Sequence, residues 1–167
     1  MHAIPRLAPR LAVIGLACAA SAPAQAQLIA HKDLSAAMAL TIAETAMNTC
    51  TATGYHVSVT VLGRAAEIIV QIRGDGASPH TVENSMRKAY TSRTFRTPSG
   101  EIAKRYKEDP QLFMVHLSNV IPAQGALPIK VGEDVVGAVG VSGSPGGEKD
   151  EVCAKAGIEK IKDRLAP

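Results

Sequence analysis

The stretch Gly74–Gly100 constrains the fold of this chain most, because a tight turn, a helix start and a polar helix follow one another within it. The turn Gly74–Gly76 contains two glycines, which adopt positive φ angles without steric cost. Pro79 then leads into a predicted helix over Thr81–Thr94, which we expect the hydroxyl of Thr81 to cap. Apolar or partly apolar side chains recur on one side of this helix, which predicts that this side is buried: Val82, Met86, Ala89, Tyr90 and Arg93.

His80 lies immediately before this predicted helix. The partial positive charge of a helix N-terminus disfavours the imidazolium form and leaves a nitrogen lone pair available for a metal. The alternative is that His80 is a polar surface residue that bonds to a nearby carbonyl. The residue pattern leaves both interpretations open, whereas His56 and His116 are interpreted as ordinary polar residues.

The remaining segments predict an α+β fold, because strands and helices do not alternate along the chain. Asp33 is expected to cap a first helix that ends near Cys50, and a last helix is expected over Glu148–Leu165. Between them we expect a hairpin of Tyr55–Leu62 and Glu67–Arg73, a short helix over Glu101–Lys107, and short strands over Val120–Ala123, Pro128–Val131 and Val135–Val141. The prediction is a sheet of about five mostly antiparallel strands with the first and last helices packed on one face. With three Tyr, two Phe and no Trp, its core must be aliphatic.

Residues 1–26 have the pattern of a secretory signal peptide, and residues 27–167 are predicted to form a single domain. Arg6 and Arg10 precede the apolar run Leu11–Ala20, and the small residues of Ala24–Ala26 offer a cleavage site. The run is shorter than the roughly 20 residues that a membrane-spanning helix needs, so we expect a periplasmic or secreted protein without stable membrane insertion. Without the two arginines, 16 basic side chains (18 − 2) balance 15 acidic ones, which gives no electrostatic case for nucleic-acid binding.

Cys50 and Cys153 are predicted to form a disulfide. If the first and last helices lie antiparallel on one sheet face, the end of the first and the start of the last meet at the same edge, where a bridge is geometrically feasible. An exported compartment permits the bond, which would enclose 102 residues (153 − 50 − 1). The alternative is a pair of small buried thiols.

Two segments, His80–Glu101 and Gly125–Ile161, carry a resemblance to a known family. Their specific features are Ser85 with Lys88–Thr91, Pro128–Ile129, and Gly137–Gly143 followed by Asp150. Over roughly Leu34–Leu165 the chain resembles the GlcG/HbpS family of small haem-binding proteins, and it also resembles the C-terminal domain of PduO-type proteins. The resemblance implies a layered α+β domain, haem as the cofactor and assembly into a homo-oligomer.

The resemblance also favours His80 as the protein's axial ligand to haem iron. A haem propionate needs a cation or a hydroxyl nearby, so further contacts are predicted from Arg87, Lys88, Tyr90 and Arg96. The alternative for these basic residues is a solvated helix face.

Three functions are compatible with these features. The first is non-enzymatic binding of haem by an exported protein that stores, relays or senses it. The second is a haem-degrading enzyme or a binder of a related tetrapyrrole such as a corrinoid, and the third is an accessory subunit that serves only assembly. The sequence contains no recognisable Ser/His/Asp triad, CxxC, HExxH, CxxCH or phosphate-loop motif, and acidic residues follow the glycine-rich loop Ser142–Gly147. The resemblance implies the first of these functions, non-enzymatic haem binding, and this is our prediction.

Overall fold

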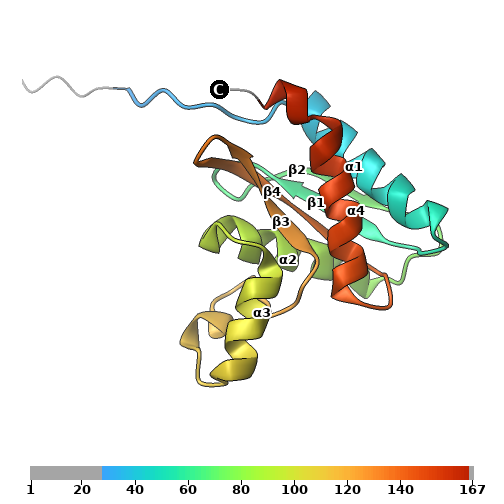
Figure 1. The fold of residues 1–167 in the computed structure, drawn as a ribbon, viewed down its shortest axis with the longest axis vertical. Coiled ribbons are helices and arrows are strands. Elements are labelled where there is room, and N and C mark those ends of the chain that lie inside the picture. Colours follow the sequence, from blue (N-terminus) through green and yellow to red (C-terminus); the bar gives the residue numbers. More distant parts are fainter. Residues whose placement is uncertain (1–27, 166–167) are drawn as a thin grey trace, which may run out of the picture. The chain divides into compact units, whose positions relative to one another are not determined.

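A computed structural model describes residues 28–165 of the chain, so the predicted signal peptide, residues 1–26, lies outside the described residues. The domain is a four-stranded antiparallel sheet in the order β2-β1-β4-β3. Helices α1 and α4 pack side by side on one face of the sheet, and α2 packs on β1, β4 and β3 (Figure 1). The elements are α1 (Ala36–Ala52), β1 (Ser58–Leu62), β2 (Ile68–Arg73), α2 (His80–Phe95), α3 (Ser99–Glu108), a 3-10 helix (Phe113–His116), β3 (Ala126–Val131), β4 (Asp134–Ser142), α4 (Gly147–Lys160) and a second 3-10 helix (Lys162–Arg164).

The predicted α+β class, the hairpin and the packing of the first and last helices on one face are confirmed. The described sheet has four strands, and the predicted strand over Val120–Ala123 was wrong. This segment bonds to side chains of α2: Val120 O accepts from Arg87 Nη2 at 3.0 Å, and Ile121 N donates to Thr91 Oγ1 at 2.9 Å. Its backbone groups are thus satisfied without a neighbouring strand.

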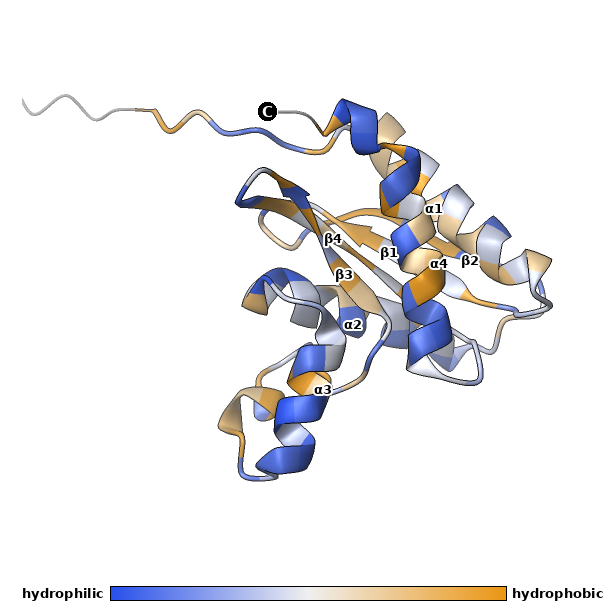
Figure 2. Ribbon diagram, viewed as in Figure 1, coloured by the Kyte–Doolittle hydropathy of each residue, from blue (hydrophilic) through white to orange (hydrophobic). Residues whose placement is uncertain are grey.

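The two faces of β1 are buried in different ways. Val57, Val59 and Val61 belong to the hydrophobic core that includes α1 and α4. Ser58 and Thr60 point to the other face, which α2 covers. Figure 2 shows hydrophobic residues concentrated in the strands.

Helix α2 buries a largely polar side. Of the residues expected to be buried, Ala89 is buried, and the others are half-buried: Val82, Met86, Tyr90 and Arg93. The buried residues of α2 are Thr81, Ser85, Lys88, Ala89, Thr91 and Ser92. Thr81 and Ser85 bond to Ser58 and Thr60 of β1, each at 2.8 Å between hydroxyl oxygens. Small side chains also bring the helix close to β4, since a Cβ at Gly140 would lie 2.2 Å from the carbonyl oxygen of Ser85.

The expected helix caps were also wrong. Helix α1 is capped by Ser35, whose Oγ accepts from Met38 N at 3.2 Å, and not by Asp33. The hydroxyl of Thr81 donates to Ser78 O at 2.7 Å and makes no cap. Helix α4 ends at Lys160, five residues before the predicted end at Leu165. Among the residues described, no helix combines the length and the apolar character that crossing a membrane requires.

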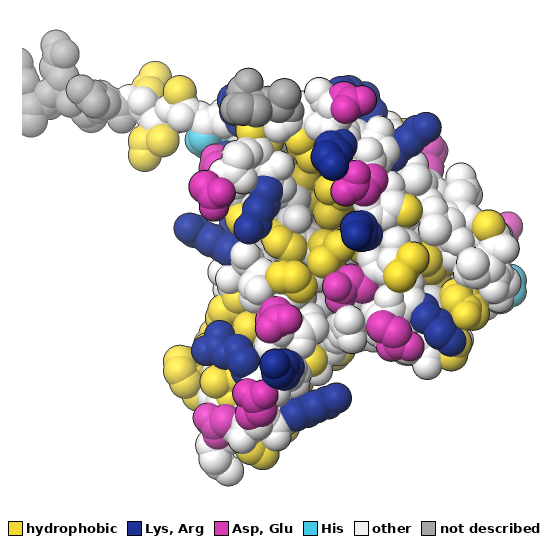
Figure 3. Space-filling view, in the orientation of Figure 1, with side chains coloured by type: hydrophobic (Ala, Val, Ile, Leu, Met, Phe, Trp, Pro, Cys, Tyr) yellow, Lys and Arg dark blue, Asp and Glu magenta, His cyan; other side chains and the backbone are white. Residues whose placement is uncertain are grey.

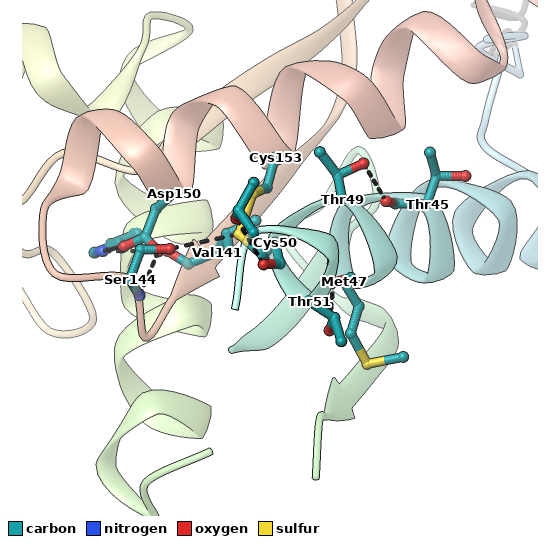
Figure 4. The surroundings of a disulfide bond; sticks show 11 residues. Thr45, Met47, Thr49, Cys50, Thr51, Val141, Ser144, Asp150 and Cys153 are labelled. Carbon is teal, nitrogen blue, oxygen red and sulfur yellow. Dashed lines mark hydrogen bonds and ion pairs between the residues drawn. A yellow bond between two sulfur atoms is a disulfide. The ribbon is translucent and has the colours of Figure 1, made fainter. Parts of the chain in front are cut away.

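The structure contains the predicted disulfide between Cys50 and Cys153, whose Cα atoms lie 5.6 Å apart. Cys50 is near the C-terminus of α1 and Cys153 is in the second turn of α4, and both are buried (Figure 4). The bond therefore ties the two helices that cover one face of the sheet.

We expect the double substitution Cys50→Ala with Cys153→Ala to lower the free energy of unfolding by about 2–5 kcal/mol, because the bond restricts a long loop in the unfolded chain. Urea unfolding of the two proteins measures the difference. Thiol titration of unreduced, denatured protein lacking residues 1–26 should find no free thiol, and two per chain would contradict the disulfide.

Candidate functional site

Helices α2 and α3 and the loop of residues 142–147, which joins β4 to α4, surround a polar hollow of about 790 Å³. The side chains that line it include Asn84 and Lys88 from α2, Lys104 and Lys107 from α3, and Glu148, Asp150 and Glu151 from α4. Cations and carboxylates are therefore both present. Such a hollow suits a ligand that presents polar or charged groups of its own.

A buried ion pair lies at the wall of this hollow. Lys88 Nζ is 2.7 Å from Asp150 Oδ2, and the side chains are 6% and 2% exposed. Lys88 Nζ also donates to Val141 O at 3.1 Å, and Asp150 Oδ1 accepts from Ser144 N at 3.0 Å. The pair thus joins α2, the end of β4, the loop and α4. The ammonium of Lys88, a predicted haem contact, is already engaged within the protein.

Gly125 makes room for this pair. It has a φ of +131°, which side-chain-bearing residues rarely adopt. A Cβ here would lie 2.8 Å from Lys88 Nζ and 2.9 Å from Asp150 Cβ. The glycine is therefore required both by the backbone and by the close approach of the two charged groups.

The disulfide adjoins the same loop. Cys50 Sγ lies 3.4 Å from Ser144 Oγ, and the backbone of Ser144 bonds to Asp150 (Figure 4). On the other side of the loop, Asn84 Nδ2 donates to Ser142 Oγ at 2.9 Å. Contacts therefore run without a break from the disulfide through the loop to α2, and they hold the wall of the hollow in one position.

His80 is the first residue of α2 and is exposed. It lines a second, smaller hollow of about 310 Å³ together with Glu83, Asn84 and Arg87. Asn84 lines both hollows, so they adjoin. Arg87 is held by Val120 O and lies 3.7 Å from Glu83. His80 and Arg87 are therefore the two predicted site residues that the structure brings together.

Tyr90 and Arg96 lie elsewhere on the helix. Tyr90 is half-buried on the outward side that was expected to be in the core, and Arg96 follows the end of α2 with a left-handed φ of 57°. Arg96 is 16 residues beyond His80, which in a helix corresponds to about 24 Å along the axis and about 160° around it. The backbones of His80 and Arg96 therefore lie at opposite ends of α2.

Arg96 belongs instead to a group of arginines at the C-terminal end of α2. Burial, followed by the charges of Arg96 and Arg64, lowers the pKa of Arg93. Its Nε is buried and has no hydrogen-bond partner among the described residues. Arg64 binds Asp134 at 2.6 Å, and this hydrogen bond lowers the pKa of the Asp134 carboxyl group. The bond links the β1–β2 turn to the β3–β4 turn.

Several residues of the site were not predicted as such. Asn84 and Ser144 make the hydrogen bonds that connect the loop to α2 and to Asp150, and Lys107 lines the larger hollow. The sequence did indicate Asp150, but only through the family resemblance, and it did not indicate that Asp150 pairs with Lys88. Which residues face Asp150 depends on how α2 and α4 are placed across the sheet.

Among residues 28–165, no group of three or more His, Cys, Asp or Glu side chains is arranged to hold a metal ion. A bare metal ion bound by the protein would need such a group. A haem iron brings four nitrogen ligands and needs one axial donor from the protein, which a single histidine supplies. The donor set at His80 therefore fits haem better than a bare metal.

The sheet, its covering helices and the polar hollow define the chain as a small layered α+β domain. A family model described as "Haem degrading protein HbpS-like" matches residues 34–159, and the chain belongs to this family.

Solved structures agree with this assignment. A crystal structure of HbpS matches with a TM-score of 0.76 and 32% sequence identity, covering 83% of this chain and 97% of that chain. A double mutant of Streptomyces reticuli HbpS matches with the same score and identity, covering 84% and 97%. A PduOC–haem complex matches with a TM-score of 0.70 over 78% of this chain and 96% of that chain, and at 20% identity the likeness concerns the fold alone. No curated protein sequence matches.

The buried ion pair generates a prediction about stability. Asp150→Ala should lower the free energy of unfolding by about 3–5 kcal/mol, because it leaves the Lys88 ammonium buried without its carboxylate. Adding Lys88→Met should restore part of the loss, since no unpaired charge is then buried. Denaturant unfolding of the three proteins measures both effects.

The exposed pair of Lys162 and Glu159, 3.4 Å apart, provides the control. Glu159→Ala should change the stability by less than about 1 kcal/mol. A similar small change for Asp150→Ala would contradict the importance assigned to the buried pair.

Proposed function

We propose that this protein binds haem without reacting with it, and that it stores, relays or senses haem in the periplasm or outside the cell. The observation that supports haem as the ligand is membership of the HbpS-like family over residues 34–159. The signal-peptide pattern of residues 1–26 supports export. The near balance of charge without this segment argues against a nucleic-acid partner.

In this proposal, His80 is the axial ligand to the haem iron. It is the first residue of α2 and lines the smaller of two adjoining hollows. Arg87 is the cation beside it, and Tyr90 is a further candidate contact on the same helix. Bound haem would supply an iron centre able to take an axial ligand, whereas the protein positions the imidazole and the charges around it.

The other two predicted contacts have different roles in the proposal. Lys88 supports the site from within, because its ammonium holds Asp150 and the loop of residues 142–147. Arg96 would contact a carboxylate remote from His80 of the same chain. Lys104 and Lys107, which line the larger hollow, are better placed than Arg96 to attract the propionates of a haem near His80.

Haem degradation is the second candidate function, because the matching family is described as haem-degrading. Because the chain also resembles PduO-type proteins, a corrinoid is a further candidate ligand. We favour binding without reaction, since the described residues near His80 present no motif of a known catalytic arrangement.

We also propose that the protein is a homo-oligomer. Val82, Met86 and Tyr90 follow one another at four-residue spacing on the outward side of α2, where each is only half-buried. A helix side of this kind is covered by another apolar surface in many oligomers. A second copy of the chain is the partner that the family resemblance favours.

The ligand assignment is tested by the absorption spectrum of the haem-loaded protein. His80→Ala should abolish the Soret band of the bound form or shift it strongly, because the iron loses its axial donor. His56→Ala and His116→Ala are matched controls and should leave the spectrum unchanged. An unaltered spectrum for the His80 variant would contradict the assignment.

The same sample separates binding from degradation. With a reductant and oxygen present, a binding protein should keep its Soret band, and a haem-degrading enzyme should lose the band and yield a linear tetrapyrrole. Absence of any Soret shift on adding haem would contradict both functions.

Self-association is measured by light scattering. We expect a mass above that of a single chain at micromolar concentration, and a lower mass for Met86→Glu, because a buried carboxylate opposes apolar contact. Thr94→Glu, an exposed position at the end of the same helix, is the control and should keep the mass of the unmodified protein. A single-chain mass for the unmodified protein would rule out the oligomer.

A further inference from the structure

A small surface pocket of about 200 Å³ adjoins the disulfide on the side of Cys153. The residues that line it come from the end of α1, the segment that follows α1, and α4: Thr49, Thr53, Tyr55, Lys149, Val152 and Cys153. Cys50, which is completely buried, is not among them. A group that enters the pocket from solvent therefore meets Cys153 and not Cys50.

The charge of this pocket differs from that of its surroundings. Figure 3 shows basic and acidic side chains mixed over the face of the molecule that α4 occupies. Among the described residues that line the pocket, Lys149 is the only charged one. Its ammonium nitrogen lies 5.5 Å from the centre of the Tyr55 ring, and no carboxylate of the described residues lies within 4.0 Å of that nitrogen. An anion in the pocket is thus attracted by one lysine and meets no carboxylate in the lining.

The other sulfur of the bond has a hydrogen-bond donor beside it. Cys50 Sγ lies 3.4 Å from Ser144 Oγ (Figure 4). A disulfide sulfur carries no hydrogen, so the Ser144 hydroxyl is the donor in this contact. If the bond breaks and Cys50 becomes a thiolate, the same hydroxyl is in place to stabilise the negative charge.

We propose that the disulfide is a site of thiol–disulfide exchange, at which an anionic low-molecular-weight thiol attacks Cys153 through this pocket. The thiolate sulfur bonds to Cys153 Sγ while the bond to Cys50 breaks, and Cys50 leaves with the electron pair as a thiolate. A second thiolate then attacks the sulfur of the first in the mixed disulfide, which releases Cys153. Both cysteines take up protons from water, two external thiols are oxidised to one disulfide, and the disulfide of the protein is reduced.

Three small thiols of similar size test the proposal on purified protein expressed from the full 167-residue sequence. They are 2-mercaptoethanesulfonate with a negative group, 2-mercaptoethanol with a neutral group and cysteamine with a positive group. Loss of the disulfide without denaturant is followed by acid quenching, alkylation and mass spectrometry. Lys149→Glu should lower the rate with the sulfonate by about threefold or more, raise the rate with cysteamine and change the rate with 2-mercaptoethanol little. Each reagent is compared between two proteins, so differences in reagent acidity cancel.

Two further variants accompany this one. Lys155→Glu makes the same charge change at another exposed position of α4 that does not line the pocket, and it should leave all three rates unchanged. Ser144→Ala should lower the rate with every thiol by about two- to tenfold, because the departing Cys50 loses its hydrogen-bond donor. Since Lys149 and Lys155 are exposed, their variants are expected to fold, and equal unfolding midpoints verify this.

Peptide mapping after brief treatment with the sulfonate identifies the sulfur that is attacked. We expect the reagent on Cys153 and a free thiol on Cys50. The third cysteine, Cys18, lies in the predicted signal peptide, and mapping separates it from the other two. A reagent adduct on Cys50 would place the attack on the other sulfur and contradict the proposal.

Exchange that requires an unfolded chain would give a different result. The rate would then reach a plateau set by unfolding as the thiol concentration rises, and it would not depend on the charge of the reagent. That outcome, or a disulfide that none of the three thiols reduces in the folded protein, would overturn the proposal. The measurements contain no haem, so their result is independent of the proposed haem binding.

Discussion

The buried ion pair between Lys88 and Asp150 is the interaction on which the polar part of this structure depends. Two charges taken out of water are tolerated only when each meets its partner and further hydrogen-bonding groups, here Val141 O and Ser144 N. To supply the ammonium, α2 must turn a polar side toward the sheet. The hydroxyls of Thr81 and Ser85 then bond to those of Ser58 and Thr60, and they complete an interface with little apolar area.

The disulfide supports this interface from the opposite side of the sheet. It joins α1 to α4 at Cys153, three residues after Asp150, and Cys50 contacts Ser144 of the glycine-rich loop. The ion pair thus holds α2 to α4, the disulfide holds α4 to α1, and Asp150 also binds the backbone of Ser144 in the loop. The ion pair and the disulfide lie close to the larger hollow, which explains how a loop rich in glycine can form a defined wall.

Much of the fold could be predicted from the sequence, because its helices and strands are encoded in local patterns. The alternation in residues 55–62 indicated a strand, and the glycine turn before His80 indicated a helix start. The errors have different causes. Val120–Ala123 has the composition of a strand, but side chains of α2, distant in the sequence, satisfy its backbone. Ser35 replaces Asp33 as a cap because the helix begins two residues later, which is a local displacement of its start.

The sequence by itself determined the α+β class, the order of most elements, the family and a pairing of cysteines that the structure contains. Only the tertiary structure decided which side of α2 is buried, which residue Lys88 binds, and that His80 adjoins Arg87 but is distant from Arg96. Periodicity shows how apolar residues are distributed along one element. A prediction of burial from periodicity assumes that the apolar side faces inward. Here an ion pair and hydroxyl contacts between segments up to 62 residues apart turned a largely polar side inward, and their partners meet only when the sheet is assembled.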